Sequence, residues 1–131
     1  FSLASADLDR DGDFDLAAAN DSHSLGILLN QGDGRFATRV QYTAQLTPTS
    51  VALGDLNGDE AADAVVTTGT LLRVFRNQGD GSFAALGEYG VNSRSVVVGD
   101  VDADGDSDLA VTAGPILLYR NQGDGGFAAP L

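Results

Sequence analysis

Cysteine is absent from this chain of 131 residues, so disulfide bonds and thiolate metal sites are excluded. Methionine is absent too, and the chain opens at Phe1, so we expect a processed product or an excised piece. No apolar run approaches the ~20 residues that a membrane-spanning helix needs. We therefore expect no membrane insertion.

Positive charge is scarce. The seven basic residues are all arginine and face 19 acidic residues, which gives a formal net charge of -12. Such a surface repels nucleic acid and anionic membranes, so neither is an expected partner. Fourteen of the acidic residues lie in three short loops. The acidity is therefore concentrated where cations could neutralise it.

These loops begin at Asp7, Asp55 and Asp100, and the first reads Asp-Leu-Asp-Arg-Asp-Gly-Asp-Phe-Asp. Carboxylates this close repel one another strongly unless a cation lies among them. Oxygen-only ligands on a compact loop favour a hard ion, with calcium ahead of magnesium. Glycine at the sixth position permits the sharp backbone turn.

The loops belong to an internal repeat, since their starts are 48 and 45 residues apart. A second motif, Asn-Gln-Gly-Asp-Gly-x-Phe, begins at Asn30, Asn77 and Asn121, at spacings of 47 and 44. Two independent motifs with nearly the same period indicate a repeat of roughly 46 residues.

Each unit contains short apolar runs, rich in β-branched and aromatic residues and bounded by Gly, Asp and Asn, which is typical of strands. In chain order the runs are 3–6, 16–19, 27–29 and 36–42; then 51–54, 64–68, 71–75 and 83–89; then 96–99, 109–113, 116–119 and a stub from 127. No window has sustained helical periodicity. The pattern predicts an all-β fold. We expect a β-propeller, and a twelve-stranded sandwich is the alternative.

Four antiparallel strands in about 45 residues match one blade of a β-propeller. We therefore predict three blades, which form a partial wheel, at about residues 1–46, 47–91 and 92–131, the last with an incomplete outer strand. Phe36, Phe83 and Phe127 are expected to pack between blades. An open wheel leaves two apolar end faces, so either further blades of a longer chain or identical chains should complete it. Among homo-oligomers a dimer with six blades is favoured.

The loop and turn motifs together resemble the FG-GAP (VCBS-type) repeat of integrin α-subunit-like β-propellers, in three copies covering essentially the whole chain. The resemblance implies one calcium ion in each loop, held by side chains at positions 1, 3, 5 and 9 and by the backbone carbonyl at position 7. The implied ligands are Asp7, Asp9, Asp11, Asp13 (carbonyl) and Asp15; Asp55, Asn57, Asp59, Ala61 (carbonyl) and Asp63; and Asp100, Asp102, Asp104, Asp106 (carbonyl) and Asp108.

The second loop departs from this pattern, because Glu60 replaces the glycine and Asn57 replaces an aspartate. We therefore expect up to three calcium ions, with the second site weakest. An EF-hand is excluded, because position 12 is Ala18, Val66 or Val111 rather than glutamate and the flanks read as strands. The remaining alternative is a set of acidic turns without metal.

Catalytic candidates are few. Asp21, Ser22, His23 and Ser24 are adjacent in sequence, and adjacent residues rarely converge into a triad, so His23 is expected to be a solvated loop residue. Asp33, Asp80 and Asp124 are expected to form turns. Arginines beside Tyr42, Tyr89 and Tyr119 could form a recognition surface, be ordinary exposed strand residues, or cover apolar surface with their stems; these arginines are Arg73, Arg76 and Arg120.

The resemblance implies a secreted or extracellular, non-catalytic module for interaction or adhesion, with a protein or carbohydrate as partner. Two alternatives stay open. The chain could be a scaffold fragment that self-assembles into a closed propeller without a ligand of its own. It could also belong to a polysaccharide-acting enzyme, although the three short repeats leave no insertion to build a pocket.

Overall fold

A computed structural model describes residues 2–20 and 22–131, which form eleven strands and no helix. The strands are β1 (Ser2–Ala6), β2 (Asp15–Asn20), β3 (Ser24–Leu28), β4 (Val40–Thr43), β5 (Ser50–Gly54), β6 (Asp63–Thr67), β7 (Leu71–Asn77), β8 (Phe83–Gly90), β9 (Ser95–Gly99), β10 (Asp108–Thr112) and β11 (Ile116–Tyr119). The all-β prediction is confirmed. Nothing helical in the described part of the chain could cross a bilayer.

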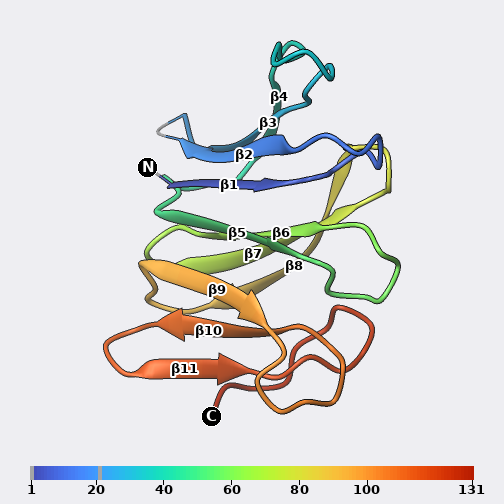
Figure 1. Cartoon of the computed structure of the whole chain (residues 1–131). Coiled ribbons are helices and arrows are strands. Elements are labelled where there is room, and N and C mark those ends of the chain that lie inside the picture. Colours follow the sequence, from blue (N-terminus) through green and yellow to red (C-terminus); the bar gives the residue numbers. More distant parts are fainter. Residues whose placement is uncertain (1, 21) are drawn as a thin grey trace.

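The strands form three separate antiparallel sheets, which we call the first, second and third blades. Their strand orders are β1-β2-β3-β4, β5-β6-β7-β8 and β9-β10-β11, so every strand pairs with its neighbour in sequence. Figure 1 shows the blades stacked in chain order, from the blue first blade to the red third blade. The stack is open, as predicted for part of a propeller.

Two apolar clusters hold the stack together. The first lies between the first and second blades and includes Leu8, Leu25, Phe75 and Phe83. The second lies between the second and third blades. All five residues of β6 are buried because this strand has a blade on each side. Each blade alone would leave both faces in water, so stacking supplies most of the buried apolar surface.

The outer strands differ from the expectation. In the first blade the run 36–42 is not one strand: Phe36 forms a single bridge with Asn30, and β4 begins only at Val40. In the second blade β8 is continuous over the corresponding residues, from Phe83 to Gly90, although most of its side chains are exposed. In the third blade the expected stub is a single bridge between Asn121 and Phe127.

Candidate metal-binding loops

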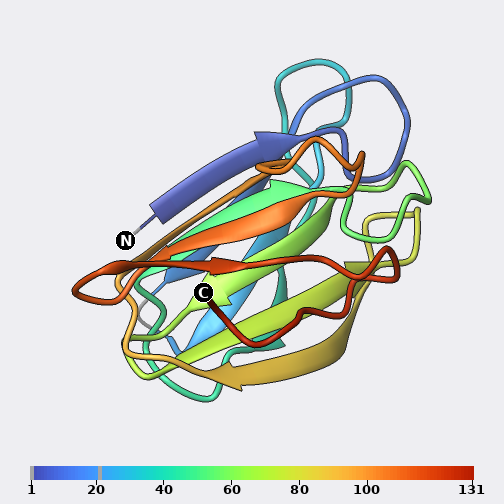
Figure 2. The same ribbon diagram turned by 90° about the horizontal axis from the view of Figure 1, so that it is seen from below.

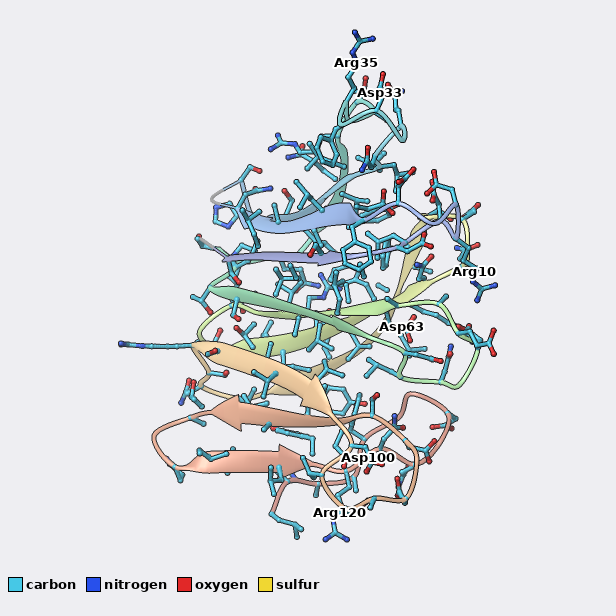
Figure 3. The ribbon with its side chains drawn as sticks, in the orientation of Figure 1. Arg10, Asp33, Arg35, Asp63, Asp100 and Arg120 are labelled. Carbon is cyan, nitrogen blue, oxygen red and sulfur yellow. The ribbon has the colours of Figure 1, made fainter. Side chains whose placement is uncertain are left out.

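Each aspartate loop connects the first two strands of its blade. In the first blade, β1 and β2 pair from Ser2 with Ala19 to Ala6 with Asp15, and the loop fills the space between those ends. The other two loops follow the same register, from Gly54 paired with Asp63 and from Gly99 paired with Asp108. Figures 1 and 2 show the three loops at the same end of the strands. Figure 3 shows Arg10, Asp63 and Asp100 along that edge.

The loops wind around the carboxylate at position 1. In each loop the backbone amide at position 6 donates to this carboxylate: Gly12 to Asp7 at 3.0 Å, Glu60 to Asp55 at 2.8 Å, and Gly105 to Asp100 at 3.0 Å. The amide at position 7 likewise donates to the carboxylate at position 5, at 2.9 to 3.0 Å. These bonds fold alternate side chains toward one centre.

The three loops have the same backbone conformation at positions 4 and 6, although their sequences differ there. Positions 4 and 6 both have a positive φ in every loop, and each loop has one glycine at these two positions. The first and third loops place glycine at position 6 and carry Arg10 (φ 64°) and Ala103 (φ 64°) at position 4. The second loop reverses this, with Gly58 at position 4 and Glu60 (φ 65°) at position 6. Each loop therefore bears one non-glycine residue in the left-handed region, so Glu60 does not single out the second loop.

The carboxylate at position 9 has a structural role that the sequence did not reveal. Asp15 is buried and accepts from the amides of Leu8 and Asn30, both at 2.7 Å. Asp63 accepts in the same way from Leu56 at 3.2 Å and Asn77 at 2.8 Å, and Asp108 from Val101 at 3.0 Å and Asn121 at 2.8 Å. Each of these aspartates ties its loop to the end of the third strand, and lone pairs remain on its oxygens for a cation.

The first and third loops bring acidic oxygens closest together. Asp7, Asp9 and Asp11 each offer an oxygen within 4.8 Å of the others, as do Asp100, Asp102 and Asp108. Asp7 Oδ1 is buried and has no hydrogen-bond partner. A buried carboxylate oxygen without a donor is costly unless a cation meets it. The donor set and this orphaned oxygen fit a hard cation at the first loop.

Crowding of negative charge is visible in the pKa values. Burial and then the charges of Asp15, Asp11 and Asp7 raise the pKa of Asp9. In the third loop, burial and the charges of Asp104 and Asp108 raise the pKa of Asp102. A cation among these groups would relieve the repulsion and favour the ionised forms.

The second loop is partly neutralised by arginine. Arg76 lies 3.3 Å from Asp59 Oδ2, and Arg10, from the first loop, donates to the Asp59 carbonyl oxygen. Asn57 donates to the same Oδ2 at 3.0 Å. The bond from the Ala61 amide, and after it those from Asn57 and Arg76, lowers the pKa of Asp59. The guanidinium groups thus neutralise part of the negative charge that a metal ion would neutralise in this loop.

The side chains at position 7 lie away from the centre of their loops. Asp13 Oδ2 would be 2.9 Å from a Cβ atom built on Gly32, and Asp106 Oδ2 would be 3.1 Å from one built on Gly123. These carboxylates therefore face the Gly-Asp-Gly turn of their own blade. This arrangement leaves only the backbone carbonyl of position 7 as a possible ligand, as the resemblance implied.

The other candidates have structural surroundings. His23 is exposed in the β2–β3 connection, with Thr47 Oγ1 3.4 Å from its Nδ1, and Asp21 lies outside the described residues. Asp33 and Asp80 accept from the amides of Arg35 and Ser82, and Asp124 from that of Gly126, as turn-forming aspartates do. Figure 3 shows Asp33 and Arg35 at the tip of the β3–β4 connection.

The arginines and tyrosines do not form one recognition surface. Arg73 is buried, lies 2.6 Å from Glu88 and donates to the carbonyl oxygen of Thr43. Of the roles left open for Arg73, covering apolar surface fits best, because its guanidinium carbon lies 5.6 Å from the centre of the Phe75 ring and the stacking of two blades covers the side chain. Arg76 and Arg120 are exposed, whereas Tyr119 is buried in the second cluster.

The interblade hydrogen bonds are a feature that sequence reasoning missed. The side chain of the asparagine that opens the repeated turn motif donates to the preceding blade. Asn77 donates to the Leu8 carbonyl oxygen at 2.8 Å, and Asn121 to the Leu56 carbonyl oxygen at 2.7 Å. The hydroxyls of Tyr42 and Tyr89 accept from the amides of Phe83 and Phe127 in the blade that follows. The recurrence of this asparagine in all three units was the sequence signal that could have predicted these bonds.

Comparisons with known proteins agree with this architecture. A search of the curated proteins found no match. Among solved structures, BBS1N in complex with ARL6DN, from a mercury-soaked crystal, superposes with a TM-score of 0.69 at 16% identity over 98% of this chain. The Photorhabdus luminescens Tc holotoxin pore superposes with a TM-score of 0.56 at 24% identity, also over 98% of this chain. This chain spans 38% and 7% of the length of those two chains.

At these identities the structural matches show the fold alone. The family model described as an FG-GAP-like repeat matches twice, over residues 7–66 and 56–111, and so includes all three aspartate loops. The matches together span most of the chain and overlap over residues 56–66, in the second loop and the start of β6. With the stacked four-stranded units and loops described above, they establish that this chain belongs to the FG-GAP-like repeat family of β-propeller modules.

Proposed function

We propose that the chain is a calcium-stabilised, non-catalytic β-propeller module for extracellular interaction, with a protein or carbohydrate as its partner. The observation that carries the calcium part is the winding of each loop around its first carboxylate, with Asp7 Oδ1 buried and unpartnered in the first loop. Oxygen ligands on a flexible loop suit calcium better than magnesium, which demands a near-ideal octahedron.

The proposed ion supplies positive charge that offsets the aspartates and cross-links the loop to itself. In the first loop Asp7, Asp9 and Asp11 would hold it, and in the third Asp100, Asp102 and Asp108 would do so. The buried aspartate at position 9 keeps each loop fixed to the third strand of its blade. Calcium binding should therefore stiffen the inner hairpin of the blade rather than create a reaction centre.

We further propose that the three sites differ in affinity. The first loop has the orphaned oxygen, and Arg10 points from it to the second loop. In the third loop Arg120 lies 3.5 Å from Asp102 and competes weakly. In the second loop Arg76 and Arg10 both approach Asp59, and Asn57 brings no charge. The expected order of affinity is first, third, second.

The extracellular role rests on the type of site. Extracellular modules commonly bind calcium at ~10⁻⁴ to 10⁻³ M, so they are filled outside cells and would be largely empty in the cytosol. A non-catalytic role is supported by the surroundings of the acidic residues: most of those in the loops accept from backbone amides, and those in the turns cap the turns. An acid held by a bound cation is a poor general acid.

Thermal unfolding of the full chain in chelator and in 5 mM calcium, about fivefold to fiftyfold above such dissociation constants, tests the stabilising role. We expect a higher Tm in calcium than in chelator or in equal magnesium. Equal Tm values in all three would contradict the proposal. A glycan array and a pull-down from extracellular protein, each with calcium and with chelator, test the interaction role. Release of reducing ends from polysaccharides by the purified chain would refute the non-catalytic assignment.

A further inference from the structure

The two internal interfaces of the stack are built from the same positions of the repeat. The residue at position 2 of each loop enters the core shared with the next blade: Leu8 is 0% exposed and Leu56 is 2% exposed. The corresponding residue of the third loop is Val101, which is 50% exposed. The third blade therefore presents an apolar side chain whose counterparts are fully buried against a following blade.

The hydrogen bonds repeat in the same way. The carbonyl oxygens of Leu8 and Leu56 each accept from the asparagine of the following blade. In the first blade the equivalent asparagine, Asn30, donates to the Phe14 carbonyl at 3.2 Å, which matches the second bond of Asn77, to Ala62. Asn30 thus makes the bond within its blade. The donor for a further interblade bond, Asn30, lies at one end of the stack, and the matching acceptor, the carbonyl oxygen of Val101, lies at the other.

The glycine turns give a third, independent match. The second glycine of each Gly-Asp-Gly turn lies against the preceding blade, where a Cβ on Gly81 would be 2.7 Å from Leu29 and one on Gly125 would be 3.6 Å from the Leu56 carbonyl oxygen. Both glycines are buried. At Gly34 a Cβ would meet nothing within 4 Å. The first blade therefore has an empty place where the loop of a preceding blade would lie.

The apolar residues on the end faces complete the pattern. On the outer face of the first blade, Leu3 is 71% and Phe36 39% exposed, whereas their counterparts Val51 and Phe83 are buried against the first blade. On the outer face of the third blade, Val97 and Ile116 are exposed at positions whose second-blade counterparts, Ala52 and Leu72, face the third blade. Figure 1 shows these two faces at opposite ends of the stack.

We propose that the outer face of the third blade binds the outer face of the first blade of a second copy of this chain, so that two chains close head to tail into a six-bladed ring. The occupant is a second copy because each end face offers the half of the internal interface that the other end lacks. Two such junctions, related by the rotation of the ring, leave no open blade face.

Charge opposes this junction more than it opposes the internal ones. Arg10 bridges the first and second loops by approaching Asp59, whereas the equivalent residue of the third loop is Ala103. The junction would bring the third and first loops together, each with five aspartates. The proposed dimer should therefore tighten with salt, and with calcium if the loops bind it. A dimer that persists in chelator with salt supports this interface even if the calcium proposal fails.

Two variants, one at each end, test the proposal by complementation. Val101→Asp alters the third-blade face and Leu3→Asp the first-blade face, and both side chains are already exposed in the single chain. Val40→Asp is the matched control, because Val40 is also 50% exposed but lies on β4, paired with Ile27, away from both end faces. An unpaired carboxylate buried in the junction should weaken dimerisation at least about 100-fold.

The measurement is sedimentation equilibrium of the full chain from 1 to 100 µM in 0.3 M salt, with circular dichroism to verify folding. We expect dimers for the unaltered chain and the Val40 variant, and monomers for each end variant alone. When the two end variants are mixed, we expect a heterodimer joined at its one unaltered junction and weaker than the unaltered dimer, because its other junction carries both carboxylates. A folded monomeric unaltered chain would overturn the proposal. So would a dimer that survives both end variants, or an open ladder of larger species.

Discussion

Asn77 offers the most direct test of how the blades are joined. Its side chain is fully buried, donates to the carbonyl oxygens of Leu8 at 2.8 Å and Ala62 at 3.1 Å, and accepts from the amide of Gly79 at 2.9 Å. Asn77→Ala removes all three bonds and leaves the Leu8 carbonyl buried and the partners on Ala62 and Gly79 partly buried. At ~1 kcal/mol for each lost bond, plus a desolvation penalty for the carbonyl groups, the free energy of unfolding should fall by about 3–5 kcal/mol.

Asn30 is the matched control, since it occupies the same position in the first blade. It makes only the bonds within its blade, to the Phe14 carbonyl at 3.2 Å and from the Gly32 amide at 3.1 Å, and it is only partly buried. Asn30→Ala should cost about 1 kcal/mol, because water can reach the groups left behind. The difference between the two variants, about 2–4 kcal/mol, is the contribution of the interblade bond and its burial.

Urea unfolding monitored by circular dichroism measures both values on the full chain. The slope with urea concentration should be unchanged in both variants, so that the midpoint reports stability. Equal losses of stability for Asn77→Ala and Asn30→Ala would mean that the bond across the interface contributes nothing to stability.

Three further outcomes follow from the loops. Asp7→Asn should remove the tightest calcium site and so cut the calcium-induced rise in Tm more than Asp59→Asn does; a larger loss for Asp59→Asn would reverse the proposed order of sites. Arg76→Gln should strengthen calcium binding at the second loop several-fold by freeing Asp59, as read by titration calorimetry; unchanged or weaker binding would show that the arginine does not compete. In chelator, stability should rise as the pH falls from 7.5 to 5. Burial raises the pKa of Asp63 to about 6, so the folded chain binds more protons than the unfolded chain between about pH 4 and 6. A Tm that falls over this range would contradict that assignment.

The repeat and its strands could be predicted because they depend on local patterns. The spacing of Asp7, Asp55 and Asp100 gave the period, and short β-branched runs between turn residues gave the strands. The outer strands were less predictable, since Phe36–Tyr42 and Phe83–Tyr89 look alike in sequence. In the structure the first run is interrupted and β4 begins only at Val40, whereas the second run is one continuous strand, a difference that the two sequences do not signal.

The roles of single residues within the loops depend on packing and could not be read from spacing alone. Asp15, Asp63 and Asp108 were predicted only as ligands, yet each holds two backbone amides. The arginines beside Asp59 come from β7 and from a neighbouring loop, 17 and 49 residues away in sequence. Contacts of that separation are set by how blades stack, which a local motif does not encode.

The proposed role of the loops depends on calcium binding by their aspartates. Titration calorimetry of the chelator-treated full chain with calcium measures this binding, and the titration is repeated with Asp7→Asn and with magnesium as titrant. We expect saturable binding with dissociation constants of ~10⁻⁴ to 10⁻³ M, two stronger sites and one weaker, and the loss of one strong site in Asp7→Asn. A titration with no binding heat at several temperatures, together with an identical Tm in calcium and in chelator, would contradict it.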